Sequence, residues 1–338
     1  MGVRQRIISI LLGTCLLLCG CGAAKPAVEP LPEENKLVIY TSHKAEIYEP
    51  IIQEFEERTG IWVEVYDGGS SELLQRIAKE SADPNADVIF GGGADTLHAY
   101  SDYFAPYEVK VRNQITSDYA PEDNGFTLFS EFPIVFVYNK KLVFSAGTPQ
   151  TWSELLEGKW KGKIAYANPA NSGSAYTALC TLLTVTRDRM EQQEVIEKFT
   201  SNLNGKLCDS SAEVLEEVIS GSSAVGIATE DEAKKYIEQG ADIGIAYPED
   251  GTAVVPDGTA IVKGAKHEEN AKLFLEFSVC DDAQQLLQEY GYRRSVRDDL
   301  KSEASVEAID YDMEWAQNNR EDTLSRFHYA FVGEEGAQ

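Results

Sequence analysis

The feature that most constrains the fold is a series of short apolar segments, each followed by a stretch with helical spacing. Residues 37–40 fit a buried strand, and residues 45–58 follow with the spacing of an amphipathic helix. Strands at 61–66 and 87–90 flank a further helix at 72–79. This βαβαβ order predicts a parallel sheet with right-handed crossovers. The sequence therefore predicts an α/β protein.

The rest of the chain continues the alternation and predicts a second lobe. The chain crosses between the lobes near residues 128–136 and returns near 248–258, and this double crossing predicts a hinge with a cleft between the lobes. We expect lobe 1 to comprise residues 37–130 and 255–338, and lobe 2 residues 131–254. Strands are expected at 126–129, 134–138, 163–166, 224–228, 243–247 and 258–262, and helices at 152–156, 175–184, 192–201, 212–219, 231–239, 268–279 and 281–290.

The net charge of the chain limits the classes of partner that it can bind. The 338 residues carry 56 Asp and Glu against 30 Lys and Arg, a formal charge of −26. No basic field exists to replace phosphate counterions, so we expect no nucleic acid as partner. The same charge disfavours electrostatic docking on an anionic membrane. If the ligand is an anion, we expect neutral backbone and hydroxyl donors to bind it.

The first residues predict export. Arg4 and Arg6 precede an apolar run at 7–18 that is too short to span a bilayer and typical of a signal peptide. The run ends in Leu18-Cys19-Gly20-Cys21, which resembles the lipobox of bacterial lipoproteins. We expect residues 1–20 to be removed, Cys21 to be acylated, and residues 21–36 to form a tether. The protein would then be extracytoplasmic and held at the membrane by its lipid alone, whereas a plain signal peptide is the alternative.

Three further cysteines give no metal or cofactor signal. Cys180, Cys208 and Cys280 have no CxxC spacing, and the four histidines are scattered. We therefore predict no metal site and no cofactor, and the simplest interpretation is three small buried thiols. Whether any two of them pair stays open.

The candidate binding residues follow the predicted strands. Ligands of open α/β sheets bind beyond the carboxyl ends of strands, where helix N-termini and hydroxyl groups favour anions. Glycines and serines at these positions also make turns and cap helices without any ligand. The candidates in these loops are Ser42, His43, Gly69, Ser70, Gly92, Gly93, Ser172, Gly173 and Ser174.

Three acidic residues complete the candidate site. Glu230 and Asp231 directly follow a predicted strand, and Asp209 precedes another predicted helix. Their carboxylates could accept hydrogen bonds from sugar hydroxyls or an ammonium group. Alternatively, Glu230 and Asp231 are first-turn residues that complement a helix dipole.

Five segments of the chain carry a family resemblance: Leu37 to His43, Phe55 to Ile61, Ala86 to Gly92, Gly158 to Ile164 and Asn270 to Phe274. They resemble the extracellular solute-binding proteins of ABC importers, in the branch labelled ferric-iron, 2-aminoethylphosphonate or hexose-phosphate binding. The resemblance implies a type II periplasmic-binding-protein fold that closes on its ligand and delivers it to a permease and an ATPase.

The resemblance leaves the ligand open. Ferric members carry a Tyr-Tyr pair after a strand like 224–227, where this chain has Ala228 to Glu232. Hexose-phosphate binders place acids where Glu230 and Asp209 stand. We therefore expect a monomeric, non-enzymatic receptor for a small phosphorylated or phosphonate solute. Ferric iron is the alternative, and a cysteine enzyme using Cys208 is a third hypothesis.

Overall fold

The computed structural model describes residues 33–338 apart from 116, 118, 144–146, 301–305 and 334–338. The predicted signal peptide, Cys21 and most of the predicted tether lie outside the described residues. Within the described part of the chain, no helix is both long and apolar enough to cross a membrane.

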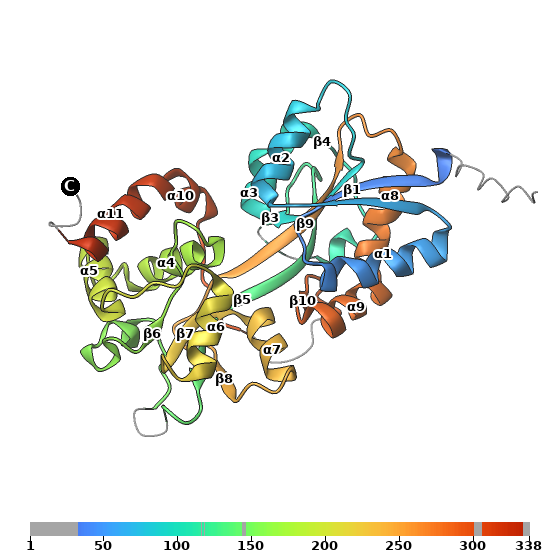
Figure 1. Cartoon of the computed structure of the whole chain (residues 1–338). Coiled ribbons are helices and arrows are strands. Elements are labelled where there is room, and N and C mark those ends of the chain that lie inside the picture. The colour runs from blue at the N-terminus through green and yellow to red at the C-terminus, as the bar shows by residue number, and fades with distance from the viewer. Residues whose placement is uncertain (1–32, 116, 118, 144–146, 301–305, 334–338) are drawn as a thin grey trace, which may run out of the picture. The chain divides into compact units, whose positions relative to one another are not determined.

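The predicted βαβαβ unit is present in the first part of the body (Figure 1). Strand β1 (Lys36–Thr41) lies between β2 (Trp62–Asp67) and β3 (Val88–Gly93) and pairs with both in parallel. Helices α1 (Ala45–Thr59) and α2 (Ser70–Lys79) make the crossovers. The parallel sheet and its helices are therefore confirmed.

Two long strands form the middle of the sheet and run side by side in Figure 1. The two strands predicted on either side of Glu131 are one continuous strand, β5 (Thr127–Asn139), and β9 (Val254–Val262) pairs with it in antiparallel orientation. The sheet order is β2-β1-β3-β9-β5-β7-β6, with β4, β8 and β10 attached to β9 or β5. The remaining strands are β4 (Phe104–Ala105), β6 (Ile164–Ala165), β7 (Val225–Thr229), β8 (Ile243–Ala246) and β10 (Arg294–Ser295).

Most predicted helices form, with shifted ends. The predicted helix at 152–156 is instead a 3₁₀ turn, Ser153–Leu156. A short helix after β3 and two helices after residue 310 had no counterpart in the prediction. The other helices are α3 (Ala94–Ala99), α4 (Gly173–Thr186), α5 (Gln192–Leu203), α6 (Ser211–Ser220), α7 (Glu230–Glu238), α8 (Glu268–Ser278), α9 (Asp281–Gly291), α10 (Met313–Asn318) and α11 (Arg320–Val332).

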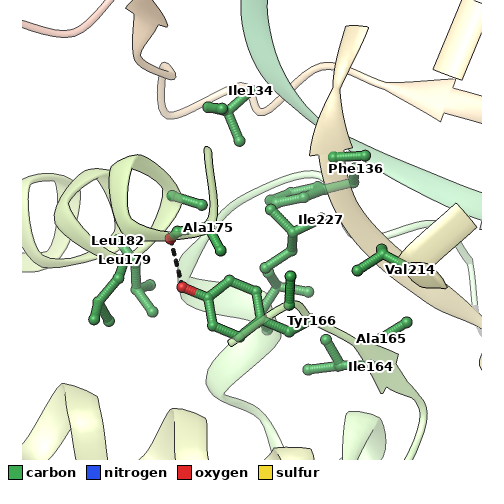
Figure 2. Packing of buried hydrophobic residues seen from close by; sticks show 14 of the residues in the cluster. Ile134, Phe136, Ile164, Ala165, Tyr166, Ala175, Leu179, Leu182, Val214 and Ile227 are labelled. Carbon is green, nitrogen blue, oxygen red and sulfur yellow. Dashed lines mark hydrogen bonds between the residues drawn. The ribbon is translucent and has the colours of Figure 1, made fainter. Parts of the chain in front are cut away.

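The buried apolar residues form two separate clusters. One cluster surrounds β1 and β3, where the rings of Phe90 and Phe129 meet edge to face with centroids 4.7 Å apart. The other surrounds β7 and α4, and Figure 2 shows Tyr166 in this cluster, its hydroxyl donating to the carbonyl of Ala175. Tyr311, Ala316 and Phe327 also belong to the second cluster, although they follow β9 in the chain. The lobe boundaries stay a prediction.

Replacing Gly226 by alanine is expected to destabilise the protein by about 1–3 kcal/mol, because the new methyl group overpacks the second cluster. A Cβ at this position would lie 2.8 Å from Val214, 2.9 Å from Val218 and 3.0 Å from Val137. Gly158→Ala is the matched control, since a Cβ there meets nothing within 4 Å. Urea unfolding would measure both variants, and equal midpoints would contradict the packing account.

Candidate ligand-binding site

A cavity of about 640 Å³ lies between residues of the two clusters. This volume is in the range of small-molecule sites in proteins. Lys44, Gly93 and Arg293 are among the lining residues close to the first cluster, whereas Ser174 and Asp231 come from helices packed on the second. The cavity therefore draws its walls from both halves of the described body.

Four of the predicted site residues line the cavity: Gly93, Gly173, Ser174 and Asp231. The others are absent from its lining, and their roles stay predictions. Ser42 lies beside Gly91. Asp209 is exposed, and its backbone N–H donates a hydrogen bond to the carboxylate of Glu213. The predicted residues outside the lining are Ser42, His43, Gly69, Ser70, Gly92, Ser172, Asp209 and Glu230.

Three serine hydroxyls meet at the beginning of α4 and α6. Ser172 caps α4 by accepting a hydrogen bond from the backbone N–H of Ala175. Its Oγ lies 3.1 Å from Ser174 Oγ and 3.0 Å from Ser211 Oγ, and the last two oxygens are 3.0 Å apart. Of these three serines, Ser211 was not predicted as a site residue, because the predicted helix begins one residue later, at 212. Ser174 and Ser211 both line the cavity.

His43 is buried and is not part of the cavity lining. Its ring packs against Phe90 and Phe129, with centroids 4.6 and 5.5 Å away. Burial, together with the charge of Arg293, holds the pKa of His43 well below its usual range. His43 Nδ1 lies 3.7 Å from Asp257, and Nε2 has no hydrogen-bond partner among the described residues. His43 is thus a neutral residue of the core in this structure.

Glu230 is buried at the first position of α7, and its carboxylate is fully engaged. The guanidinium of Arg294 contacts it twice, at 2.7 and 2.8 Å, and the hydroxyl of Tyr247 donates to it. Lys234 Nζ lies 3.2 Å away. Burial alone would raise the pKa of Glu230, but these hydrogen bonds and positive charges outweigh it and lower the pKa. The carboxylate is therefore ionised and already paired.

Asp231 differs from Glu230 because only one of its two carboxylate oxygens has a hydrogen-bond partner among the described residues. Arg293 Nε donates to Asp231 Oδ2 at 3.0 Å, and the same guanidinium pairs with Asp257. The other oxygen, Asp231 Oδ1, is buried and has no hydrogen-bond partner among the described residues. Asp231 lines the cavity, and this oxygen keeps an unused capacity to accept a hydrogen bond.

The cavity contains four cationic side chains that the sequence analysis did not expect. Lys44 lies 3.0 Å from Glu232, and Lys235 pairs with Glu46, so these two ion pairs connect α1 and its N-cap to α7. Arg293 is paired as described above. Arg320 stacks on Tyr176 and has no ion pair with a described residue. The cavity lining therefore contains cationic groups besides the neutral donors that the sequence predicts, and which of them face an anion stays a prediction.

The three described cysteines are free thiols. Cys180 and Cys208 are buried, and Cys280 is partly exposed. Burial, reinforced by Glu213 and Glu217, raises the pKa of Cys208 to about 11. A thiol with this pKa is almost entirely protonated at neutral pH, which is unfavourable for a nucleophile.

Comparisons with known proteins agree with this geometry. Residues 50–312 match the family described as bacterial extracellular solute-binding proteins. The chain is 28% identical over 306 residues to iron uptake protein A1 of Synechocystis sp., covering 85% of this chain and 83% of that protein. It is 25% identical over 287 residues to a putative 2-aminoethylphosphonate-binding periplasmic protein of Salmonella typhimurium, covering 80% and 82%.

Solved structures share the fold. The periplasmic binding protein AfuA from Actinobacillus pleuropneumoniae, with exogenous fructose-6-phosphate bound, superposes with a TM-score of 0.73 at 24% identity. The match covers 88% of this chain and 98% of that one. Iron-bound HitA from Pseudomonas aeruginosa gives 0.73 at 17% identity, covering 87% and 99%.

The chain belongs to the bacterial extracellular solute-binding protein family. Its fold is that of type II periplasmic binding proteins, as the sequence predicted. It is an extracytoplasmic solute-binding protein of an ABC importer, and its relatives are transport proteins rather than enzymes. Family members bind small solutes and work with permease and ATPase subunits.

Replacing Glu230 by glutamine is expected to cost about 1.5–3 kcal/mol at neutral pH, because Arg294 loses an ionised partner. The pKa of Glu230 is lowered on folding, so its contribution is present above the unfolded pKa and disappears as the pH falls through the folded pKa. The difference between wild type and variant should therefore stay constant above the unfolded pKa of 4.5 and shrink as the pH falls below it.

Urea unfolding at a series of pH values would measure this difference. Glu238→Gln is the control, since Glu238 is exposed on the same helix. A loss of stability that stays constant across the series would mean that the charge of Glu230 is not what matters.

Proposed function

We propose that the protein is a lipid-anchored receptor that captures a small phosphorylated or phosphonate solute in the cavity. The proposed solute is of the hexose-phosphate or 2-aminoethylphosphonate type. The observation that carries the proposal is a cavity with hydroxyl and cationic groups on its walls. Two of its lining carboxylates, Asp231 and Glu232, each have one oxygen without a hydrogen-bond partner among the described residues.

The α4 side of the cavity suits an anion. Backbone N–H groups at the start of a helix are unpaired within the helix and carry partial positive charge. Gly173 and Ser174 occupy the first positions of α4, and the hydroxyls of Ser174 and Ser211 stand beside them. Hydroxyl hydrogens rotate, so the serine cluster can turn donors towards an anionic oxygen. We assign the phosphate or phosphonate group to this side.

Asp231 suits the other end of such a solute. A buried oxygen without a donor costs free energy that a ligand hydroxyl or ammonium group would recover. Sugar phosphates carry hydroxyls, and 2-aminoethylphosphonate carries an ammonium group. The relative that is 25% identical is named as a putative 2-aminoethylphosphonate-binding protein, which favours the second of these.

Ferric iron is the second candidate, because the relative that is 28% identical is named as an iron uptake protein. Fe³⁺ prefers hard oxygen ligands, among which phenolate is one of the strongest. Two tyrosines of the cavity, Tyr176 and Tyr311, are buried, and burial raises the pKa of both hydroxyls. Ionising them to bind iron would be costly, so we rank the organic anion first.

Isothermal titration calorimetry tests the two candidates. The probes are glucose 6-phosphate, 2-aminoethylphosphonate, and their matched compounds glucose and ethanolamine, added to protein that has been unfolded and refolded to remove retained ligand. We expect glucose 6-phosphate to bind about 100-fold more tightly than glucose, or 2-aminoethylphosphonate about 100-fold more tightly than ethanolamine. The reason is that the compound without the phosphorus group leaves the buried donors without a charged partner. The opposite result would be no heat from either phosphorus compound, together with tight binding and a visible colour when ferric citrate is added. That result would rank ferric iron above the organic anion.

The lipid anchor is a separate part of the proposal. We expect the mature protein to begin at Cys21 and to carry a diacylglycerol adduct, because Leu18-Cys19-Gly20-Cys21 resembles a lipobox. Cys21→Ser should release the protein from the membrane fraction, whereas Cys19→Ser should not. Intact-mass spectrometry of the processed protein measures the adduct, and an unmodified N-terminus at another residue would refute the anchor.

A further inference from the structure

The helical segment after residue 310 forms part of the cavity wall. Met313, Ala316 and Gln317 of α10 line the cavity, and so does Arg320, the first residue of α11. The sequence analysis assigned no role to this segment. Arg320 is the cationic residue that this segment contributes to the cavity wall.

Arg320 is held in place by contacts with α4. Its guanidinium carbon lies 4.2 Å from the centroid of the Tyr176 ring, a cation–π contact. Tyr176 is itself fixed, because it is buried and its hydroxyl donates to the carbonyl of Ala316 in α10. Tyr176 lies in the first turn of α4, three residues after Gly173. The guanidinium thus stands beside the helix start to which we assign the anionic group.

Arg320 also differs from the other cations of the cavity in its pairing. Lys44, Lys235 and Arg293 each contact a carboxylate, whereas Arg320 forms no ion pair with any described residue. A partly buried guanidinium normally has an anionic partner, because desolvating an unpaired charge is costly.

Helix stability does not explain this arginine. The N-terminus of a helix carries partial positive charge, so a cation at its first position is unfavourable. Arg320 occupies that position in α11. The residues of the first turn that complement the dipole are the acidic Glu321 and Asp322, which follow it. The side chain therefore has an electrostatic cost both from its helix and from its missing partner.

We infer that Arg320 binds the anionic group of the ligand and so determines that the site accepts an oxyanion. This inference rests on the proposed function and adds to it a residue supplied from outside the strand-end loops. Guanidinium groups present a planar pair of N–H donors that matches two oxygens of a phosphate, phosphonate or carboxylate. Arg320 would supply the charge, and the hydroxyls of Ser174 and Ser211 would supply neutral donors.

The test compares three variants by calorimetry with glucose 6-phosphate, 2-aminoethylphosphonate, citrate and the uncharged match glucose. Arg320→Gln should weaken binding of the responding anion about 100-fold, and Arg320→Lys about 10-fold, because lysine keeps the charge but loses the planar fork. Arg326→Gln is the control on the same helix. Arg326 contacts Gln192 and Gln193 and is not part of the cavity lining, so its replacement should leave affinity within about 2-fold.

The uncharged probe separates binding from structure. If Arg320 only stabilises the wall, Arg320→Gln should lower the melting temperature and weaken glucose and the anions alike. If it binds the anion, weak glucose binding should be unchanged. An Arg320→Gln variant that binds the responding anion as tightly as wild type overturns the inference.

The same experiment distinguishes this inference from the proposed function. If wild type binds only citrate, and Arg320→Gln loses that binding, the phosphorus ligand is wrong but Arg320 stands. If wild type binds a phosphorus compound that Arg320→Gln retains, the proposed function stands and Arg320 falls. If no anion binds the wild type, both are refuted.

Discussion

The buried charge of Asp257 is the constraint on which the middle of this structure depends. Asp257 lies on β9, where it accepts hydrogen bonds from the backbone and side chain of Ser130 on β5, the hydroxyl at 2.6 Å. Burial raises the pKa of Asp257, and the positive charge of Arg293, which lowers it, offsets only part of this shift. The guanidinium of Arg293 also reaches Asp231 at the start of α7 and lies over the ring of Phe132. One arginine therefore ties both crossing strands to the helix that borders the cavity.

This network has a consequence for how the site is built. Removing one member of a buried ion pair is far more costly than removing an exposed pair, so these charges fix the relative positions of β5, β9 and α7. The carboxylate of Asp231 is oriented by the pairing of one oxygen, and the other oxygen keeps its hydrogen-bonding capacity unused among the described residues. A structural interaction and a candidate recognition group thus share one side chain.

The sequence was sufficient for the alternating fold and insufficient for much of the site. Local periodicity predicts β1, β2 and β3 because each is a short buried run between clear turn signals. Strand-end position finds Gly93 and Ser174, since the rule concerns neighbouring residues only. The same rule selects His43, but it says nothing about whether a side chain faces a cavity or a core. Arg293 and Arg320 escape it altogether, because their partners lie 36 or more residues away in the chain.

Net charge also proved a poor guide to the local environment. The chain carries −26 overall, yet the cavity lining balances four cations against four carboxylates. Charges more than about 8 Å apart across solvent are largely screened at physiological ionic strength, so the surface acids have little influence on that cavity. The order of the lining residues along the chain adds one more consequence. Met313, Ala316, Gln317 and Arg320 follow every other residue of the lining. A chain cut before α10 would keep every described strand of the sheet and lack this part of the cavity wall, so proteolysis there would remove ligand contacts without removing a strand.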